Sequence, residues 1–247
     1  MIQKSDHNWF ETWFNSTYYH TLYKNRNEAE AELFIEKLCH FLNIPKHAKI
    51  LDLACGKGRH AIQLNKKRFN VTGTDLSKAS IDHASKYSKE DLNFFVNDMR
   101  DPFRTNHFDY IFNFFSSFGY FETDKEHINV LKNMSLGLKK DGLVTIDFMN
   151  VNKIMANLVT KEEKEIDGIK FKITKEIRDG IIIKKIAISD NGKELYFEEK
   201  VKIITLENFK YYLKNSGLEI INLLGNYDLN TFDELDSERL IIIAKKQ

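Results

Sequence analysis

A glycine-rich stretch, Asp52-Leu-Ala-Cys-Gly-Lys-Gly-Arg-His60, lies between an apolar run and a helical pattern. A glycine loop between a strand and a helix N-terminus exposes backbone N–H groups and a partial positive charge, which suits an anionic group on a ligand. Two more carboxylates end the next two apolar runs, Asp75 in VTGTDLS and Asp98 in FVNDM. Because open α/β sheets bind ligands at the carboxyl ends of their strands, these residues predict one binding site.

The spacing of the glycines argues against a dinucleotide. The GxGxxG fingerprint would need glycines at positions 54, 56 and 59, but the chain has Ala54, Gly56 and Arg59. The third glycine of that fingerprint lets helix and strand pack closely, and an arginine removes this option. The pattern Asp-x-Ala-x-Gly-x-Gly instead suits a ligand with a carboxylate and an ammonium at one end and no pyrophosphate.

The two later carboxylates indicate the rest of that ligand. Asp75 can accept both hydroxyls of a ribose, and Asp98 can accept the exocyclic amine of an adenine. Methionine moiety, ribose and adenine would then be bound in order across neighbouring strand ends, which implies S-adenosylmethionine as the cofactor and S-adenosylhomocysteine as its product. Two alternatives stay open: Asp75 could cap a helix that starts near Ser77, and Asp98 could form a surface ion pair with Arg100.

These segments together resemble the class I S-adenosylmethionine-dependent methyltransferases. DLACGKG looks like their first motif, TGTDLS like the ribose-binding strand end and NDMRD like the adenine site. A narrower similarity is to the N-methyltransferases of amino sugars and of glycine, carried by YYHTLYKNR (18–26), NFFSSFGYF (113–121) and an antiparallel insert after the fifth strand. The resemblance implies that Tyr23 and Arg26 close over the cofactor. It implies the following cofactor-binding residues: Tyr23, Arg26, Asp52, Ala54, Gly56, Gly58, Asp75, Leu76, Asp98, Met99 and Phe115.

Methyl transfer from a sulfonium needs no protein nucleophile, because the methyl group already carries an activated leaving group. The protein must align an acceptor, and orientation of this kind lowers barriers by roughly 7 to 11 kcal/mol in favourable cases. Tyr120 is the candidate catalytic residue on the acceptor side, with Glu122 and His127 behind it. Two departures from the family pattern are Lys57 between the glycines, and Ala54 in place of the first glycine, a change that is tolerable if the residue lies at negative φ.

The order of elements predicts an α/β fold. A helix over 28–44 precedes Pro45, and short apolar runs then alternate with helical segments, including a helix over 124–140 closed by Gly142. This rhythm predicts a parallel sheet covered on both faces, and the resemblance makes it a seven-stranded Rossmann-like sheet with its last strand antiparallel.

After Asn150 the pattern changes to alternating apolar and charged residues with turns at RDG and DNG. Residues 168–204 therefore predict a three-stranded antiparallel meander. We expect a methyltransferase domain from 1–150 and 205–247, and an antiparallel β insertion over 151–204 that serves as a substrate lid. Its apolar side could roof the site through Ile173, Ile182, Ile186 and Phe197.

The composition of the chain limits the classes of binding partner that we expect. A formal charge of +1 in 247 residues provides no field to gather phosphate backbones, so nucleic acid is not expected. No apolar run approaches the roughly 18 to 20 residues that span a bilayer, and no Cys or His spacing is typical of a metal site. We expect a cytoplasmic monomer or homodimer that methylates a small molecule at nitrogen or oxygen. The alternatives are a S-adenosylmethionine-binding regulatory module without turnover and, disfavoured by the missing glycine, a nicotinamide dehydrogenase.

Overall fold

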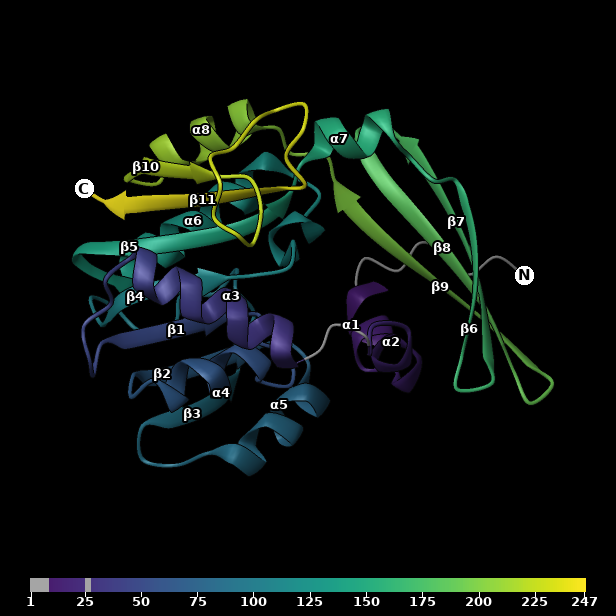
Figure 1. The fold of residues 1–247 in the computed structure, drawn as a ribbon, viewed down its shortest axis with the longest axis horizontal. Coiled ribbons are helices and arrows are strands. Elements are labelled where there is room, and N and C mark those ends of the chain that lie inside the picture. The colour runs from purple at the N-terminus through teal and green to yellow at the C-terminus, as the bar shows by residue number, and fades with distance from the viewer. Residues whose placement is uncertain (1–8, 25–27) are drawn as a thin grey trace.

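The computed structural model describes residues 9–24 and 28–247, which form two β-sheets with two short helices between them (Figure 1). The larger sheet has seven strands, and β11 runs antiparallel to both of its neighbours while the central strands are parallel. In spatial order its strands are β10 (Leu218–Leu224), β11 (Arg239–Lys246), β5 (Leu138–Met149), β4 (Phe108–Asn113), β1 (Lys49–Leu53), β2 (Asn70–Asp75) and β3 (Leu92–Val96). The predicted Rossmann-like sheet with an antiparallel last strand is confirmed.

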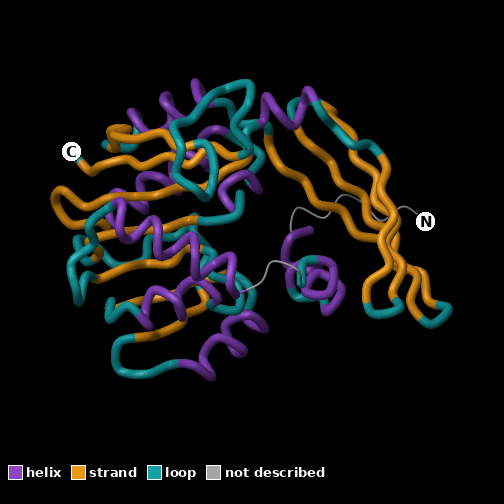
Figure 2. Tube along the Cα trace, viewed as in Figure 1, coloured by secondary structure: helices purple, strands orange, loops and turns teal. Residues whose placement is uncertain are grey.

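Helices cover both faces of this sheet, and each face has its own apolar core (Figure 2). One core includes side chains of α3 (Glu28–Phe41), α4 (Arg59–Lys66) and α5 (Lys78–Ala84), and the other includes side chains of α6 (Asp124–Gly137) and α8 (Leu206–Lys214). The central strands are therefore buried on both sides, as expected for parallel strands. Shorter helices are η1 (Ser85–Tyr87), η2 (Ser117–Tyr120) and α7 (Val151–Ala156). No helix in the described part of the chain is long and apolar enough to cross a membrane.

The helix expected over 124–140 is shorter than predicted. It begins with a capping box between Thr123 and Glu126 and ends at Gly137, and β5 starts at the next residue. Leu138 is fully buried and pairs with Phe108 in the sheet, so the chain turns to strand before Gly142 is reached. The prediction that Gly142 closes this helix was wrong, because burial of one leucine in the sheet outweighs the helical tendency of the lysines that follow.

The smaller sheet has four antiparallel strands, not the predicted three: β6 (Lys161–Ile166), β7 (Ile169–Arg178), β8 (Ile181–Asp190) and β9 (Lys193–Lys202). Its additional strand, KEEKEI, lacks apolar alternation because it lies at the sheet edge and is mostly exposed. A turn signal was present, however. Asp167 and Gly168 take the same positive φ values as the Asp-Gly and Asn-Gly pairs of the two hairpins that were predicted.

The N-terminal helix pair, α1 (Trp9–Phe14) and α2 (Thr17–Leu22), lies between the two sheets (Figure 1). Trp13 and Leu22 form a third core with Phe171, Ile173 and other side chains of the smaller sheet. Of the residues predicted to roof the site, Ile173, Ile186 and Phe197 pack in this core, against the helix pair. The apolar side of the insert thus faces helices whose aromatic residues themselves line the cavity described below, and the role of the insert as a substrate lid stays a prediction.

Candidate functional site

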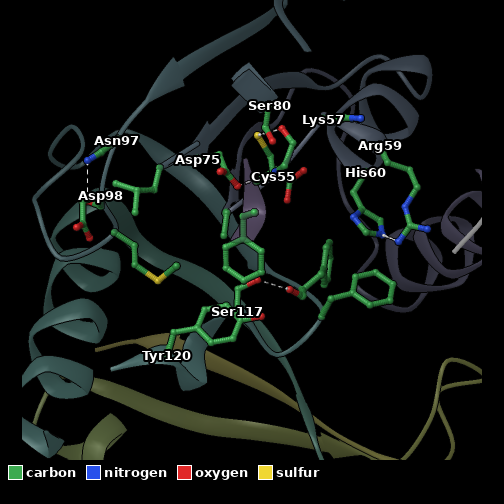
Figure 3. A pocket seen from close by; sticks show the side chains of 18 of the residues that line it. Cys55, Lys57, Arg59, His60, Asp75, Ser80, Asn97, Asp98, Ser117 and Tyr120 are labelled. Carbon is green, nitrogen blue, oxygen red and sulfur yellow. Dashed lines mark hydrogen bonds between the residues drawn. The ribbon is translucent and has the colours of Figure 1, made fainter. Parts of the chain in front are cut away.

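A cavity of about 300 Å³ opens at the carboxyl ends of β1 and β2 and continues toward the loop after β3. Figure 3 shows Asn97 and Asp98 at one end of it, Arg59 and His60 at the other, and Asp75 between them. Ser117 and Tyr120 lie across the cavity from Asp75 (Figure 3). The cavity therefore gathers the three strand ends that the sequence singled out, together with the serine and aromatic segment after β4. Leu76 and Met99, both predicted cofactor contacts, also line it.

The glycine loop after β1 turns through left-handed backbone at three residues. Ala54 has φ +62°, Gly56 +55° and Gly58 +83°, and Gly58 is the N-cap of α4. The negative φ at which alanine would be tolerated without strain is therefore not adopted at Ala54, the residue directly after β1. A side chain at Gly58 would lie 2.8 Å from the ring of Phe94, so this glycine is required by packing as well as by φ. Ala54 and Gly56 line the cavity, and Gly58 shapes the loop behind it.

Asp52 is 1% exposed, and its Oδ2 atom has no hydrogen-bond partner among the described residues. Burial raises the pKa of this carboxyl to about 7, and the nearby charge of Asp75 acts in the same direction. A buried polar atom without a partner is costly, and a cationic ligand group in the cavity would relieve that cost. The arrangement fits an ammonium group at the glycine-loop end of the ligand.

Asp75 ends β2 and organises the loop opposite it. Its carboxylate accepts hydrogen bonds from the backbone N–H of Gly56 and of Ser77, each at 2.8 Å. Ser77, not Asp75, is the N-cap of α5, with its hydroxyl accepting from the N–H of Ser80. Burial raises the pKa of Asp75. Each carboxylate oxygen keeps a second acceptor position, so the group can still bind a ribose diol while it holds the glycine loop.

Asp98 lines the same cavity and forms an ion pair with Arg100, with a distance of 2.6 Å between Oδ2 and Nη2. Burial acts to raise the pKa of Asp98, but the hydrogen bonds and charge of Arg100 outweigh it and lower the pKa. The ion-pair alternative is thus present in the structure. It does not compete with the adenine role, because a carboxylate that is ionised remains a hydrogen-bond acceptor.

The side of the cavity that lies across from Asp75 is aromatic. Tyr120, in η2, packs its ring on Trp9 and Phe14 with ring centroids 5.4 and 5.3 Å away. Phe115 has φ +59° and its ring stacks on His60, with the guanidinium of Arg59 4.7 Å from the ring centroid.

The residues expected behind Tyr120 lie elsewhere. His127 is fully buried in α6, stacked on Tyr212, and Glu122 is exposed; neither lines the cavity. Their predicted backing role was wrong, because the side chain of His127 belongs to the core between α6 and α8 and not to the cavity.

The helix pair provides cavity residues that the sequence did not assign to the site: Phe14, Tyr19 and His20, beside the predicted Tyr23. Burial, together with the charges of Lys57 and His83, lowers the pKa of His20 to about 4, so the imidazole is neutral at physiological pH. Only the family resemblance pointed to this segment, because its aromatic spacing is also that of an ordinary packing face. Arg26, the other residue predicted to close over the cofactor, lies outside the described residues.

Comparison with known proteins finds a family match over the segment that forms most of this site. Residues 50–142, which include the glycine loop and all three carboxylates, match a family described as a methyltransferase domain. The chain is 27% identical over 215 residues to the putative methyltransferase YqeM of Bacillus subtilis. This alignment covers 83% of this chain and 86% of that protein. It is 25% identical over 172 residues to a dTDP-3-amino-3,4,6-trideoxy-α-D-glucopyranose N,N-dimethyltransferase of Streptomyces venezuelae, covering 66% of this chain and 70% of that one.

The fold is shared with a crystal structure of a S-adenosylmethionine-dependent methyltransferase from Clostridium acetobutylicum. The TM-score is 0.77 at 21% identity, over 93% of this chain and 96% of the other. The chain therefore has the fold of a S-adenosylmethionine-dependent methyltransferase. Residues 50–142 carry the sequence signature of a methyltransferase domain, a family of enzymes.

Proposed function

We propose that this enzyme binds S-adenosylmethionine along the strand ends and transfers its methyl group to a nitrogen or oxygen of a small-molecule acceptor. One observation carries the proposal: Asp52, Asp75 and Asp98, from the ends of three neighbouring strands, line a single cavity. A volume of about 300 Å³ is in the range of sites that enclose small ligands.

Each end of the cofactor has a matching group in the cavity. The unpartnered Oδ2 of Asp52 would accept the ammonium of the methionine moiety, and Asp75 would accept the ribose hydroxyls. Asp98 would accept the adenine amine while Met99 packs against the base. A contact between Arg26 and the methionine carboxylate is proposed from the family resemblance alone.

The acceptor would lie between the ribose site and the aromatic side of the cavity. Bound S-adenosylmethionine supplies a methyl group on a sulfonium, so the chain's own tasks are to orient the acceptor and to exclude water. Tyr120 and the neutral imidazole of His20 are the groups that could hydrogen-bond an acceptor amine and orient its lone pair. The relative named for an amino-sugar substrate supports an amine acceptor.

Calorimetric titration with S-adenosylmethionine, S-adenosylhomocysteine and NAD tests the cofactor half of this proposal. We expect binding of the first two and none of the third. A methyl-release assay with radiolabelled S-adenosylmethionine over a panel of amino sugars, amino acids and phenols tests the other half. Binding without release on any acceptor would support the alternative of a regulatory module, and binding of NAD alone would refute the proposal.

A further inference from the structure

Two charged side chains interrupt the apolar inner face of the insert sheet. Lys184 of β8 and Glu199 of β9 are paired across the strands, and each side chain is 14% exposed. The next pair on the same face is apolar, Ile186 with Phe197. Removing two charges from water is costly unless they are paired and hydrogen-bonded. We therefore expect Lys184 and Glu199 to have further hydrogen-bond partners.

Those partners belong to the N-terminal helix pair. The Oε1 atom of Glu199 accepts a hydrogen bond from Nε1 of Trp13 and another from the hydroxyl of Tyr23, both at 2.7 Å. The Oε2 atom lies 2.9 Å from the same hydroxyl and 3.3 Å from Nζ of Lys184. Lys184 in turn donates to the hydroxyl of Tyr23 and lies 4.6 Å from its ring centroid. One carboxylate thus joins the last insert strand to α1 and to the C-cap residue of α2.

The helix pair depends on such contacts for its position. Its two helices have six residues each, well below the length at which a helix is stable in water by itself. Tyr23 is at the same time part of the cavity wall, while the cavity has no lining residue from the insert in the described ranges. The helix pair is therefore one route by which the insert can act on the site, beside the direct contact of β9 with η2.

We propose that Glu199 is a positioning residue: together with Lys184 it fixes Trp13 and Tyr23 so that the helix pair forms one wall of the reaction cavity. The inference rests on the proposed function for the meaning of that cavity. Because the hydroxyl of Tyr23 is bound to Glu199 and Lys184, its aromatic ring is the part left to form the cavity wall. The insert then acts on catalysis by holding this wall, and not by covering the acceptor directly.

The test compares Glu199→Ala and Glu199→Gln with the matched control Glu198→Gln. Glu198 is the neighbouring residue on the opposite face of β9, 42% exposed and paired with Lys200. For Glu199→Ala we expect faster hydrogen exchange in residues 9–24, with exchange in the seven-stranded sheet unchanged. We also expect S-adenosylhomocysteine affinity and kcat/KM to fall about 10- to 100-fold, because displacement of groups in a site has effects of this size. Glu198→Gln should match the wild type in every measurement.

A spectroscopic measurement separates positioning from general stability. The chain has two tryptophans, so in a Trp9→Phe background the emission reports Trp13 alone. Loss of the Glu199 hydrogen bond should shift that emission to longer wavelength, and Glu199→Gln, which keeps an acceptor oxygen, should recover part of the shift. In a double-mutant cycle, Tyr23→Phe should add little to the loss in Glu199→Ala.

Each outcome decides the inference. Unchanged exchange in residues 9–24, or affinity within twofold of the wild type, overturns it even if the enzyme is active. If Glu199→Ala does not fold, Glu199→Gln and Tyr23→Phe are compared with the wild type in the same measurements of exchange and affinity. Failure of the wild type to bind S-adenosylmethionine would refute the proposed function, while exchange and emission would still decide the role of Glu199.

Discussion

The carboxylate of Asp147, on β5, accepts a 2.7 Å hydrogen bond from Nε of Arg239 at the start of β11. Asp147 is completely buried, and its Oδ2 atom also accepts from the backbone N–H of Phe115 and from the hydroxyl of Tyr227, both at 3.0 Å. Its own carbonyl accepts from the N–H of Ser116. Phe115 and Ser116 have φ values of +59° and +61°, which non-glycine residues rarely adopt. The Asp147–Arg239 pair therefore stabilises a strained corner that directs Phe115 into the cavity.

Asp147→Asn should lower the free energy of unfolding by about 3 kcal/mol, because it removes the charge of a completely buried carboxylate from its ion pair with Arg239. Denaturation in urea measures this change. The matched control is Asp141→Asn, since Asp141 also forms a 2.7 Å pair, with Lys245, but is 60% exposed and should show no measurable effect. Equal effects of the two substitutions would contradict the role given to Asp147.

The carboxylate of Asp75 has two functions in the structure, and its removal should affect both. It holds the N–H groups of Gly56 and Ser77, and we propose that it binds the ribose hydroxyls. Asp75→Ala should therefore weaken S-adenosylhomocysteine binding by roughly 1.5 to 3 kcal/mol, the value of two charge-assisted hydrogen bonds. Calorimetry measures the loss, and Asp82→Asn, an exposed acid on α5, is the control. Wild-type affinity in Asp75→Ala would show that the ribose binds elsewhere.

The left-handed backbone at Ala54 predicts a stabilising substitution. Ala54→Gly should raise the free energy of unfolding by about 0.5 to 1 kcal/mol, because relief of the positive-φ strain exceeds the entropy cost of an added glycine. Urea denaturation of the protein without ligand is the measurement. A variant less stable than the wild type would mean that the methyl group of Ala54 contributes packing that outweighs its strain.

The parts of the site that sequence could predict are local in the chain. Asp52, Gly56 and Gly58 lie within one loop, and Asp75 and Asp98 follow apolar runs, so strand periodicity alone places them at one edge of the sheet. The parallel sheet covered on both faces followed from the same periodicity, whereas its seven strands and antiparallel last strand followed from the family resemblance. The periodicity failed at β6, because an exposed edge strand needs no apolar alternation.

The supporting contacts join residues far apart in sequence. Trp13 and Glu199 are separated by 186 positions, and Asp147 and Arg239 by 92. Both acids lie in strands where nothing in the local pattern distinguishes a buried partner from a solvated charge. Their roles depend on strand register and on which side of a sheet a helix packs, and these are properties of the assembled fold.

The raised pKa of Asp52 predicts how cofactor affinity depends on pH. In the folded protein without ligand this pKa is about 7, above the ordinary aspartate value of 3.8. Asp52 therefore favours folding most at low pH, and that contribution is lost as pH rises from about 4 to 7. A bound ammonium favours the ionised carboxylate, so binding must release a proton below pH 7. S-adenosylmethionine affinity should accordingly rise between pH 5 and 7, by up to about tenfold per unit, and then level off.

Calorimetry in buffers of different ionisation enthalpy measures the proton released directly. We expect close to one proton at pH 5.5 and a decreasing fraction as pH approaches 7. Asp52→Asn keeps the shape of the side chain but cannot ionise, so its affinity should be lower at neutral pH and flat across this range. A flat profile in the wild type would show that Asp52 does not meet the ammonium, and would move the methionine end of the cofactor away from the unpartnered Oδ2 atom.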